Sequence, residues 1–122
     1  MGYIMVVDDI AFMRRLLSGI IRGLGYEVKE AAGGKEAVLM MTASPPDLAF
    51  VDLAMPDVGG LQLCQWIRSN NNTRDIPIIV CTAHQARKDV EDALRAGADD
   101  FLCKPVDRRT VANRLAKYLI EE

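Results

Sequence analysis

Three aspartates, a threonine and a lysine stand at the ends of apolar segments, and together they could bind a cation and phosphate. Asp8 and Asp9 follow one apolar run, Asp52 closes another, and Thr82 and Lys104 follow two more. Clustered carboxylates repel one another, so such a cluster persists when a cation lies among them. Oxygen ligands with positions open to water suit Mg²⁺. One histidine and three scattered cysteines argue against a zinc centre.

A carboxylate, a hydroxyl and an ammonium group beside Mg²⁺ predict phosphoryl chemistry. The metal and Lys104 would neutralise phosphoryl oxygens, and Thr82 would donate a hydrogen bond to one of them. Asp52 is the best candidate for the nucleophile, because the adjacent Asp8 and Asp9 are better placed to hold the metal. The pattern therefore predicts transfer of a phosphoryl group to a carboxylate.

Each of these residues also has an ordinary structural explanation when it is considered alone. Asp52 could cap the turn after a strand, and Asp9 and Thr82 could cap the helices that follow them. Lys104 could be a solvated charge in a loop. Four polar endings at one edge of a sheet are hard to assign to turn chemistry alone, so we favour a common site.

Five apolar segments alternate with five segments of helical periodicity. In the helical segments, apolar residues recur three and four positions apart. In the first helix this pattern predicts one buried face, formed by Phe12, Leu16, Leu17, Ile20, Ile21 and Leu24. We expect strands at Tyr3–Val7, Tyr26–Ala31, Leu48–Asp52, Ile76–Cys81 and Phe101–Cys103, and helices at Ala11–Leu24, Lys35–Ala43, Gly60–Ser69, Gln85–Ala96 and Arg108–Ile120.

The order of these segments determines the expected fold class. Each connection between successive strands is long enough to hold a helix, so the strands should be parallel with right-handed crossovers. A parallel sheet needs helices on both faces, which agrees with the strongly apolar strands. Gly25 and Gly97 are the expected stops of the first and fourth helices. We therefore predict an α/β fold, a three-layer doubly wound sandwich with a five-stranded parallel sheet and five helices.

Length and composition fit one globular domain and exclude several classes of protein. The chain has 122 residues, of which 50% are hydrophobic and 26% charged, so a packed core is feasible. Its 15 basic and 17 acidic residues leave a net charge of −2, which predicts no contact with nucleic acid. No apolar run reaches membrane-spanning length, and no signal peptide is visible. Cys64, Cys81 and Cys103 lack metal-binding spacing, so we expect free thiols in a reducing cytoplasm.

Four motifs together make the sequence resemble the receiver domain of response regulators, the phosphoacceptor part of two-component signalling. They are VVDD near the start, VDLAMPDVGG at residues 51–60, VCTA at residues 80–83 and AGADDFLCKP at residues 96–105. The resemblance covers nearly the whole chain, so we expect residues 1–122 to form one receiver domain. It implies the flavodoxin-like strand order 2-1-3-4-5 and a cis bond between Lys104 and Pro105.

The resemblance also implies how the site would bind metal and phosphate. Asp8 and Asp9 would hold Mg²⁺ together with Asp52 and the backbone carbonyl of Ala54. Asp52 would accept the phosphoryl group from a phosphohistidine of a sensor histidine kinase or of a histidine phosphotransfer protein. Thr82 and Lys104 would contact the phosphoryl oxygens.

A conformational switch is a further implication of the resemblance. Thr82 would move toward the phosphoryl group, and Phe101, at the switch-aromatic position of the family, would rotate into the space that it leaves. The surface formed by the fourth helix, the fifth strand and the fifth helix would then change shape. A downstream effector or a symmetric dimer could bind there, because this surface carries charged residues, namely Arg87, Glu91, Arg95 and Lys117.

Three other classes of protein fit parts of the pattern. A metal-dependent phosphatase with an aspartate nucleophile would need a second aspartate where Ile10 stands. A flavodoxin-like cofactor binder would need a hydroxyl-rich loop after the first strand, where Asp8 and Asp9 would repel a cofactor phosphate. An interaction module that has lost phosphorylation would not need the intact acidic set. We therefore expect a phosphoacceptor and not an enzyme that turns over an external substrate.

The sequence leaves several features open. It identifies neither the kinase nor the output. No effector domain follows the predicted fifth helix, so a free-standing receiver and a piece of a longer regulator are both compatible with it. His84 is favoured as a solvent-exposed residue at the start of a helix, with the alternative that it orients a water near the site.

Overall fold

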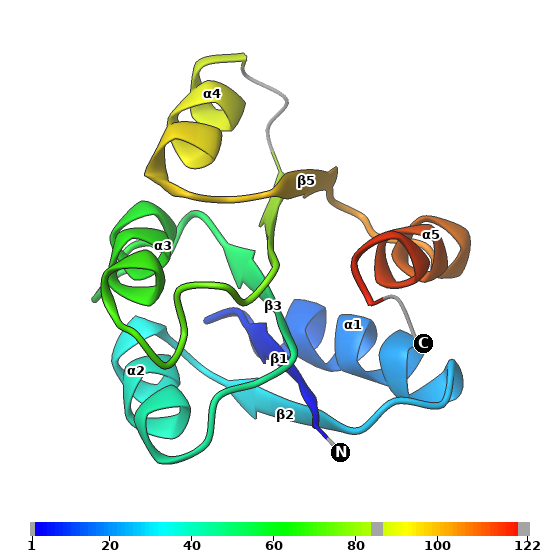
Figure 1. Cartoon of the computed structure of the whole chain (residues 1–122). Coiled ribbons are helices and arrows are strands. Elements are labelled where there is room, and N and C mark those ends of the chain that lie inside the picture. Colours follow the sequence, from blue (N-terminus) through cyan, green and yellow to red (C-terminus); the bar gives the residue numbers. More distant parts are fainter. Residues whose placement is uncertain (1, 84–86, 120–122) are drawn as a thin grey trace.

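The computed structural model describes residues 2–83 and 87–119. Strands and helices alternate along this part of the chain, as the apolar periodicity predicts (Figure 1). The strands are β1 (Ile4–Val7), β2 (Val28–Ala31), β3 (Leu48–Asp52), β4 (Ile78–Thr82) and β5 (Asp100–Cys103), and the helices are α1 (Ala11–Gly23), α2 (Gly34–Ala43), α3 (Gly60–Ser69), α4 (Arg87–Ala96) and α5 (Arg108–Tyr118).

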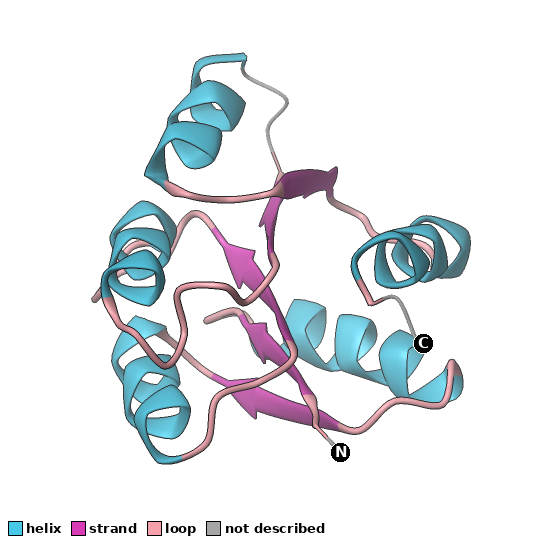
Figure 2. Ribbon diagram, in the orientation of Figure 1, coloured by secondary structure: helices cyan, strands magenta, loops and turns pink. Residues whose placement is uncertain are grey.

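The five strands form one parallel sheet in the order β2-β1-β3-β4-β5. Helices α2, α3 and α4 cover one face of the sheet, and α1 and α5 cover the other (Figures 1 and 2). The predicted α/β class, the three-layer doubly wound sandwich and the strand order are therefore confirmed. In this order β2 is added on one side of β1 and β3 on the other, so the strand order reverses between β1 and β3. Ligands of such sheets bind at the carboxyl ends of the strands at that point.

The core consists of two apolar layers, one on each face of the sheet. Successive side chains of a strand point to opposite faces, so β1 and β3 supply both layers. Val7 and Val51 pack in the layer beneath α2, α3 and α4, whereas Val6 and Phe50 pack in the layer beneath α1 and α5. All four are almost completely buried. Because β1 and β3 are covered on both faces, Asp8 and Asp52 at their ends are held on rigid strands.

Two glycines end helices as predicted. Gly25, just after α1, has φ of 98°, and Gly97, just after α4, has φ of 116°. These values lie in the left-handed region, which residues with a Cβ rarely adopt. The peptide bond between Lys104 and Pro105 is cis, also as expected.

The predicted buried face of α1 is wrong at Phe12 and Leu16, which are 73% and 38% exposed. The buried residues of α1 are Leu17, Ser18 and Ile21. Phe12 and Leu16 are four positions apart and share a stripe of the helix surface, which lies about 100° around the helix axis from the stripe through Leu17 and Ile21. The stripe of α1 that packs on the sheet is therefore narrower than the periodicity indicates.

The predicted ends of several elements are wrong by one or two residues, and β4 is the case that matters for the site. β4 begins at Ile78 and ends at Thr82. Pro77 precedes it and has no N–H group to donate to a neighbouring strand. Because β4 extends through Thr82, this residue is the last of a strand and not the first of a loop. The predicted start of α4 at Gln85 and end of α5 at Ile120 lie outside the described residues.

Candidate functional site

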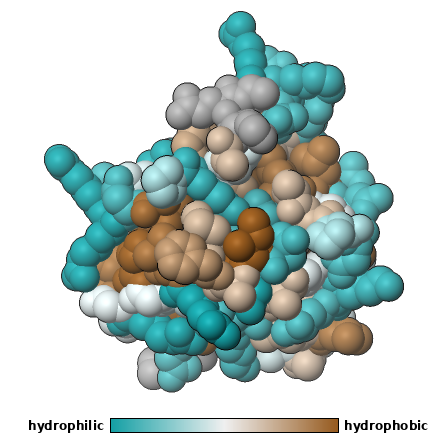
Figure 3. Space-filling model, turned by 180° about the vertical axis from the view of Figure 1, so that it is seen from behind, coloured by the Kyte–Doolittle hydropathy of each residue, from teal (hydrophilic) through white to brown (hydrophobic). Residues whose placement is uncertain are grey.

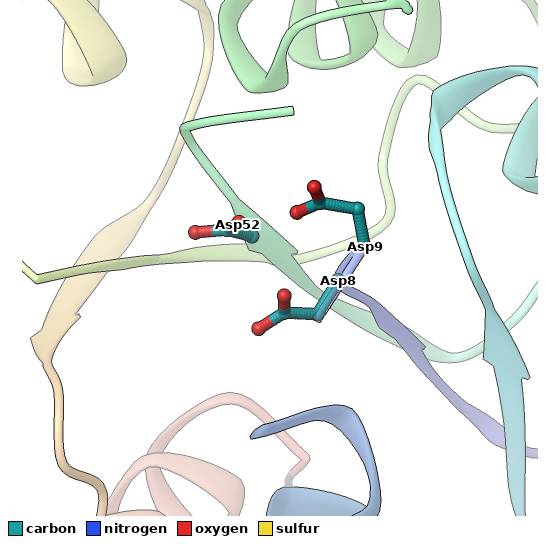
Figure 4. A group of neighbouring side chains, drawn as sticks. All are labelled: Asp8, Asp9 and Asp52. Carbon is teal, nitrogen blue, oxygen red and sulfur yellow. The ribbon is translucent and has the colours of Figure 1, made fainter. Parts of the chain in front are cut away.

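Three carboxylates meet at the carboxyl ends of β1 and β3. One oxygen each of Asp8, Asp9 and Asp52 lies within 4.8 Å of the others, and Figure 4 shows the three side chains grouped beside the strand ends. Asp8 and Asp52 are each only 5% exposed, whereas Asp9 is exposed. The cluster predicted from the sequence is therefore formed, with two carboxylates inside the fold and one at its surface.

Lys104 joins this cluster from the end of β5. Its Nζ lies 2.8 Å from Asp8 Oδ2 and 3.1 Å from Asp52 Oδ1. Burial disfavours the ammonium charge, but the hydrogen bonds to Asp8 and Asp52 outweigh that effect and raise the pKa of Lys104 above its usual value. Lys104 is thus a fixed positive charge between two buried carboxylates.

The carboxyl of Asp52 experiences the opposite balance. Burial is the main effect on it, and the negative charges of Asp8 and Asp9 act in the same direction. The hydrogen bond from Lys104 opposes them but does not cancel them, so the pKa of Asp52 is raised above its usual value. A cation near this carboxylate would favour its ionised form, which is the form that can act as a nucleophile.

Thr82 ends β4, which lies beside β3 on the side opposite β1. Asp52 pairs with Cys81 in the sheet register, and Thr82 pairs with Cys103. The Thr82 residue is 5% exposed, and its carbonyl accepts a hydrogen bond from the backbone N–H of Lys104 at 2.8 Å. The ends of β3, β4 and β5 are therefore tied together in the order that brings Asp52, Thr82 and Lys104 to one edge.

The loop after Asp52 carries Ala54 and is closed by backbone contacts. The N–H of Leu53 donates to the carbonyl of Cys81 at 3.2 Å, and the N–H of Gly60 donates to the carbonyl of Leu53 at 3.2 Å. A Cβ on Gly60 would overlap the carbonyl oxygen of Asp52, so the close approach of α3 to the strand end requires glycine there. Ala54 lies in this loop two residues after Asp52, and it is exposed.

Arg14 and Glu30 support the site and were not predicted from the sequence. Arg14 Nη1 donates to the backbone carbonyl of Asp8 at 2.8 Å, and Arg14 Nε lies 3.1 Å from Glu30 Oε1. The backbone N–H of Ile10 donates to Asp8 Oδ1 at 2.9 Å, which orients that carboxylate. An arginine one turn into a helix after an acidic strand end is a weak signal, because most such arginines are solvated.

The donor set fits a hard divalent cation. Three carboxylate oxygens are ligands that Mg²⁺ accepts, and the exposure of Asp9 leaves room for water ligands. The cysteines do not compete for such a role. Cys81 lies close by but is buried, and burial raises its thiol pKa to about 12, so it stays protonated and is a poor metal ligand.

Phe101 and His84 complete the set of residues singled out in the sequence. Phe101 lies on β5, partly buried, and borders a surface hollow of about 510 Å³ together with Val90 and Cys103. His84 lies outside the described residues.

Comparison with known proteins decides the family. Residues 4–116 match the family model described as the response regulator receiver domain. The chain belongs to this family. The expected resemblance is thereby confirmed, and receiver domains work with histidine kinases and with effector domains.

Two relatives show how much of a longer regulator the receiver domain represents. The chain is 38% identical over 112 residues to the transcriptional regulatory protein PhoP of Escherichia coli (strain K12), covering 92% of this chain and 49% of PhoP. It is 38% identical over 104 residues to the response regulator PleD of Caulobacter vibrioides (strain NA1000 / CB15N), covering 85% of this chain and 23% of PleD. The chain thus spans about half of PhoP and about a quarter of PleD.

Solved receiver structures have the same fold over almost the whole chain. The chemotaxis protein CheY4 of Vibrio cholerae superimposes with a TM-score of 0.91 at 26% identity, covering 97% of this chain and 98% of that one. The receiver domain of the sensor histidine kinase PA1611 of Pseudomonas aeruginosa PAO1 also gives 0.91, at 30% identity and 98% coverage of both chains. That structure has a magnesium ion coordinated in its active site cleft. In residues 2–83 and 87–119 of the present receiver domain, no helix has the length and apolar character needed to cross a membrane.

Proposed function

We propose that this receiver domain accepts a phosphoryl group on Asp52 from a phosphohistidine, in a reaction that requires Mg²⁺. The observation that carries the proposal is the meeting of Asp8, Asp9 and Asp52 within 4.8 Å, with Lys104 bonded to two of them. A buried nucleophile, a cation site and a fixed ammonium group are the parts that phosphoryl transfer needs.

Four groups of this chain would hold the metal, namely the carboxylates of Asp8, Asp9 and Asp52 and the backbone carbonyl of Ala54. When bound, Mg²⁺ supplies the positive charge that lets a phosphoryl group approach three carboxylates. Ion pairs with Asp8 and Asp52 hold the charge of Lys104 beside the nucleophile before the reaction.

The transfer step follows from the position of each group. A carboxylate oxygen of Asp52 attacks phosphorus, the bond from phosphorus to the imidazole nitrogen breaks, and the electron pair of that bond returns to the histidine. Lys104 contacts one phosphoryl oxygen and the hydroxyl of Thr82 donates a hydrogen bond to another. A proton on the other ring nitrogen of the phosphohistidine stays on the leaving imidazole. The products are therefore an aspartyl phosphate and a neutral histidine, and atoms and charge balance.

The donor must bring its histidine to the edge of the sheet that carries Asp52. Exposed apolar side chains of Ile10, Phe12 and Leu16 lie on or just before α1, directly after the Asp8–Asp9 pair. Hydrophobic side chains also gather among hydrophilic ones on the back face of the molecule (Figure 3). We propose that a sensor histidine kinase or a histidine phosphotransfer protein covers the α1 residues during transfer, because an exposed apolar stripe beside a reactive group favours a protein partner.

Phosphorylation would be read at the surface formed by α4, β5 and α5. Movement of Thr82 toward the phosphoryl group would let Phe101 turn inward from the hollow that it borders. Arg87 and Glu91 lie at or near that hollow, and Arg95 and Lys117 are exposed on the same helices. We propose that a downstream effector or a phosphorylation-linked dimer binds there, without direct contact to nucleic acid.

Turnover of an external phosphate ester is not proposed. An aspartate-nucleophile phosphatase would need an acid or base two positions after Asp8, and Ile10, which is 53% exposed, stands there. We propose that the chain is a phosphoacceptor. We also propose that it is located in the cytoplasm and meets its kinase there.

Mass spectrometry after incubation with acetyl phosphate and Mg²⁺ tests this function. We expect one added phosphoryl group on Asp52 and none in Asp52→Asn. Omission of Mg²⁺ should abolish the adduct in the wild type. A stable adduct on another residue, with Asp52 unmodified, would contradict the proposal.

A further inference from the structure

The loop between β3 and α3 is bound to the start of α2, which is distant in the sequence. Asp57 Oδ1 accepts a hydrogen bond from the backbone N–H of Gly34 at 3.3 Å, and Asp57 Oδ2 accepts one from the backbone N–H of Lys35 at 3.4 Å. A single carboxylate thus connects the loop that follows Asp52 to another helix.

The start of α2 needs such a partner because its own N-cap residue supplies none. The first N–H groups of a helix have no partner within the helix, and the side chain of the preceding residue often accepts from them. In α2 that residue is Gly33, which has no side chain. In α5, by contrast, Asp107 caps its own helix by accepting from the N–H of Thr110 at 2.7 Å.

The charge of Asp57 agrees with this capping role. The backbone N–H of Val58 has the largest effect on its carboxyl, and those of Lys35 and Gly34 act in the same direction. Together they outweigh desolvation and hold the pKa of Asp57 below its usual value. A carboxylate at a helix N-terminus is also favoured by the positive end of the helix dipole.

A second contact between the same loop and helix does not involve the Asp57 side chain. A Cβ on Gly34 would lie 2.5 Å from both the Cβ and the carbonyl oxygen of Val58. Gly34 is buried, so the backbones approach closely at this point. The loop is therefore held by hydrogen bonds and by packing against the first turn of α2.

These contacts hold the middle of a loop whose ends are fixed elsewhere. The hydrogen bonds of Leu53 to Cys81 and of Gly60 to Leu53 fix the two ends. Ala54 lies between the fixed start of the loop and Asp57. Because Asp57 is not in the group of carboxylates within 4.8 Å, it acts on the loop and not on the metal.

We propose that Asp57 is a positioning residue, which caps α2 from the loop and thereby holds the backbone carbonyl of Ala54 in place for Mg²⁺. This inference rests on the proposed function, since Ala54 is a metal ligand only within it. It assigns to α2, which contributes no ligand, a role in metal affinity.

Magnesium titration of the whole chain, followed by NMR, tests this role with three variants. Asp57→Ala removes the acceptor and should weaken Mg²⁺ binding by about tenfold, the lower end of the loss expected for a group that orients a metal ligand. Asp57→Asn keeps one acceptor oxygen and should weaken binding less. Glu36→Gln removes an exposed charge from the same first turn of α2 and should leave the affinity unchanged.

A second measurement follows the loop without metal. In Asp57→Ala, the amide hydrogens of Leu53 and Gly60 should exchange with solvent faster than in the wild type, while those of β1 should not change. A cap that only stabilises α2 would lower the melting temperature but leave the Mg²⁺ affinity of the folded protein unaltered.

Several outcomes would overturn the inference. Wild-type affinity in Asp57→Ala would show that the loop does not depend on the cap, and unchanged exchange at Leu53 and Gly60 would show the same without metal. Equal losses of Mg²⁺ affinity in Asp57→Asn and Asp57→Ala would assign the effect to the charge of Asp57 and not to its hydrogen bonds with α2. Absence of Mg²⁺ binding in the wild type would contradict the proposed function itself, a result that the exchange measurement distinguishes from failure of the cap.

Discussion

The ammonium group of Lys104 lies 2.8 Å from Asp8 Oδ2, although the two residues are 96 positions apart in the sequence. The same ammonium group contacts Asp52 at 3.1 Å. The Lys104 ammonium group thus offsets part of the repulsion between the two buried carboxylates, and Asp9 adds a third negative charge. The acidic edge, formed by Asp8, Asp9 and Asp52, therefore carries more negative charge than Lys104 can neutralise when no metal is bound.

Magnesium should stabilise the folded protein. A ligand that binds only the folded state raises the free energy of unfolding by about 2.7 kcal/mol at a concentration of one hundred times its Kd. Asp9→Ala should raise the metal-free Tm, because it removes one of three repelling charges, and should reduce the increase in Tm that Mg²⁺ causes. Thermal unfolding with and without millimolar Mg²⁺ measures both effects. Identical Tm values for the wild type under the two conditions would contradict a metal site.

Removal of the Lys104 charge should strongly destabilise the metal-free protein. Lys104→Met would leave Asp8 and Asp52 buried without their cation, and loss of one partner of a buried ion pair costs about 3 kcal/mol or more. The side chain of Lys104 is 11% exposed, so solvent screens this interaction little. Urea unfolding at pH 7 measures the loss, and Lys88→Met, which removes an exposed lysine of α4, is the matched control. A loss no larger than that of the control would contradict the argument.

The free energy of unfolding should depend on the charge of Lys104 at alkaline pH and on the charge of Asp52 at acidic pH. The folded-state pKa of Lys104 is raised above 10.5, so its contribution is complete below that pH and is lost as the pH rises through the folded value. The pKa of Asp52 is raised above 3.8, so acidification toward 3.8 relieves the cost of its buried charge. The destabilisation by Lys104→Met should therefore shrink both in acid and at alkaline pH. A constant difference from pH 4 to 11 would contradict these shifts.

Substitutions in α1 should separate its exposed stripe from its buried stripe. Phe12→Ser should change the free energy of unfolding by less than about 0.5 kcal/mol, as is usual for exposed positions. Ile21→Ala should lower it by about 2–5 kcal/mol, because Ile21 is fully buried. Urea unfolding measures both. A large loss in Phe12→Ser would mean that Phe12 packs against the protein in solution.

Activation should change the surface around Phe101. Beryllofluoride, which mimics an aspartyl phosphate, should shift NMR signals of α4, β5 and α5 when it is added with Mg²⁺. Phe101→Ala should reduce the shifts on these elements while preserving those of Asp8 and Asp9. If the wild-type shifts stay confined to the acidic edge, the proposed switch is wrong for this protein.

Much of the fold and of the site can be predicted from local sequence patterns. Apolar strands that alternate with helices predict a parallel sheet, because each crossover must carry a helix. Parallel strands then bring their carboxyl ends to one edge, so Asp8, Asp52, Thr82 and Lys104 could be assigned to one site before their distances were known. The order of the strands came from family resemblance and not from the pattern itself.

Other features depend on long-range packing, which periodicity does not encode. The exposure of Phe12 and Leu16 depends on how α1 is rotated against the sheet. The ion pair of Arg14 with Glu30 joins α1 to β2, and the hydrogen bonds that Asp57 accepts join its loop to α2. Both depend on which segments lie side by side after folding. By itself the sequence determined which residues stand at strand ends. The tertiary structure alone decided which of them touch and which surface residues support them, because such contacts join segments that only the packed sheet brings together.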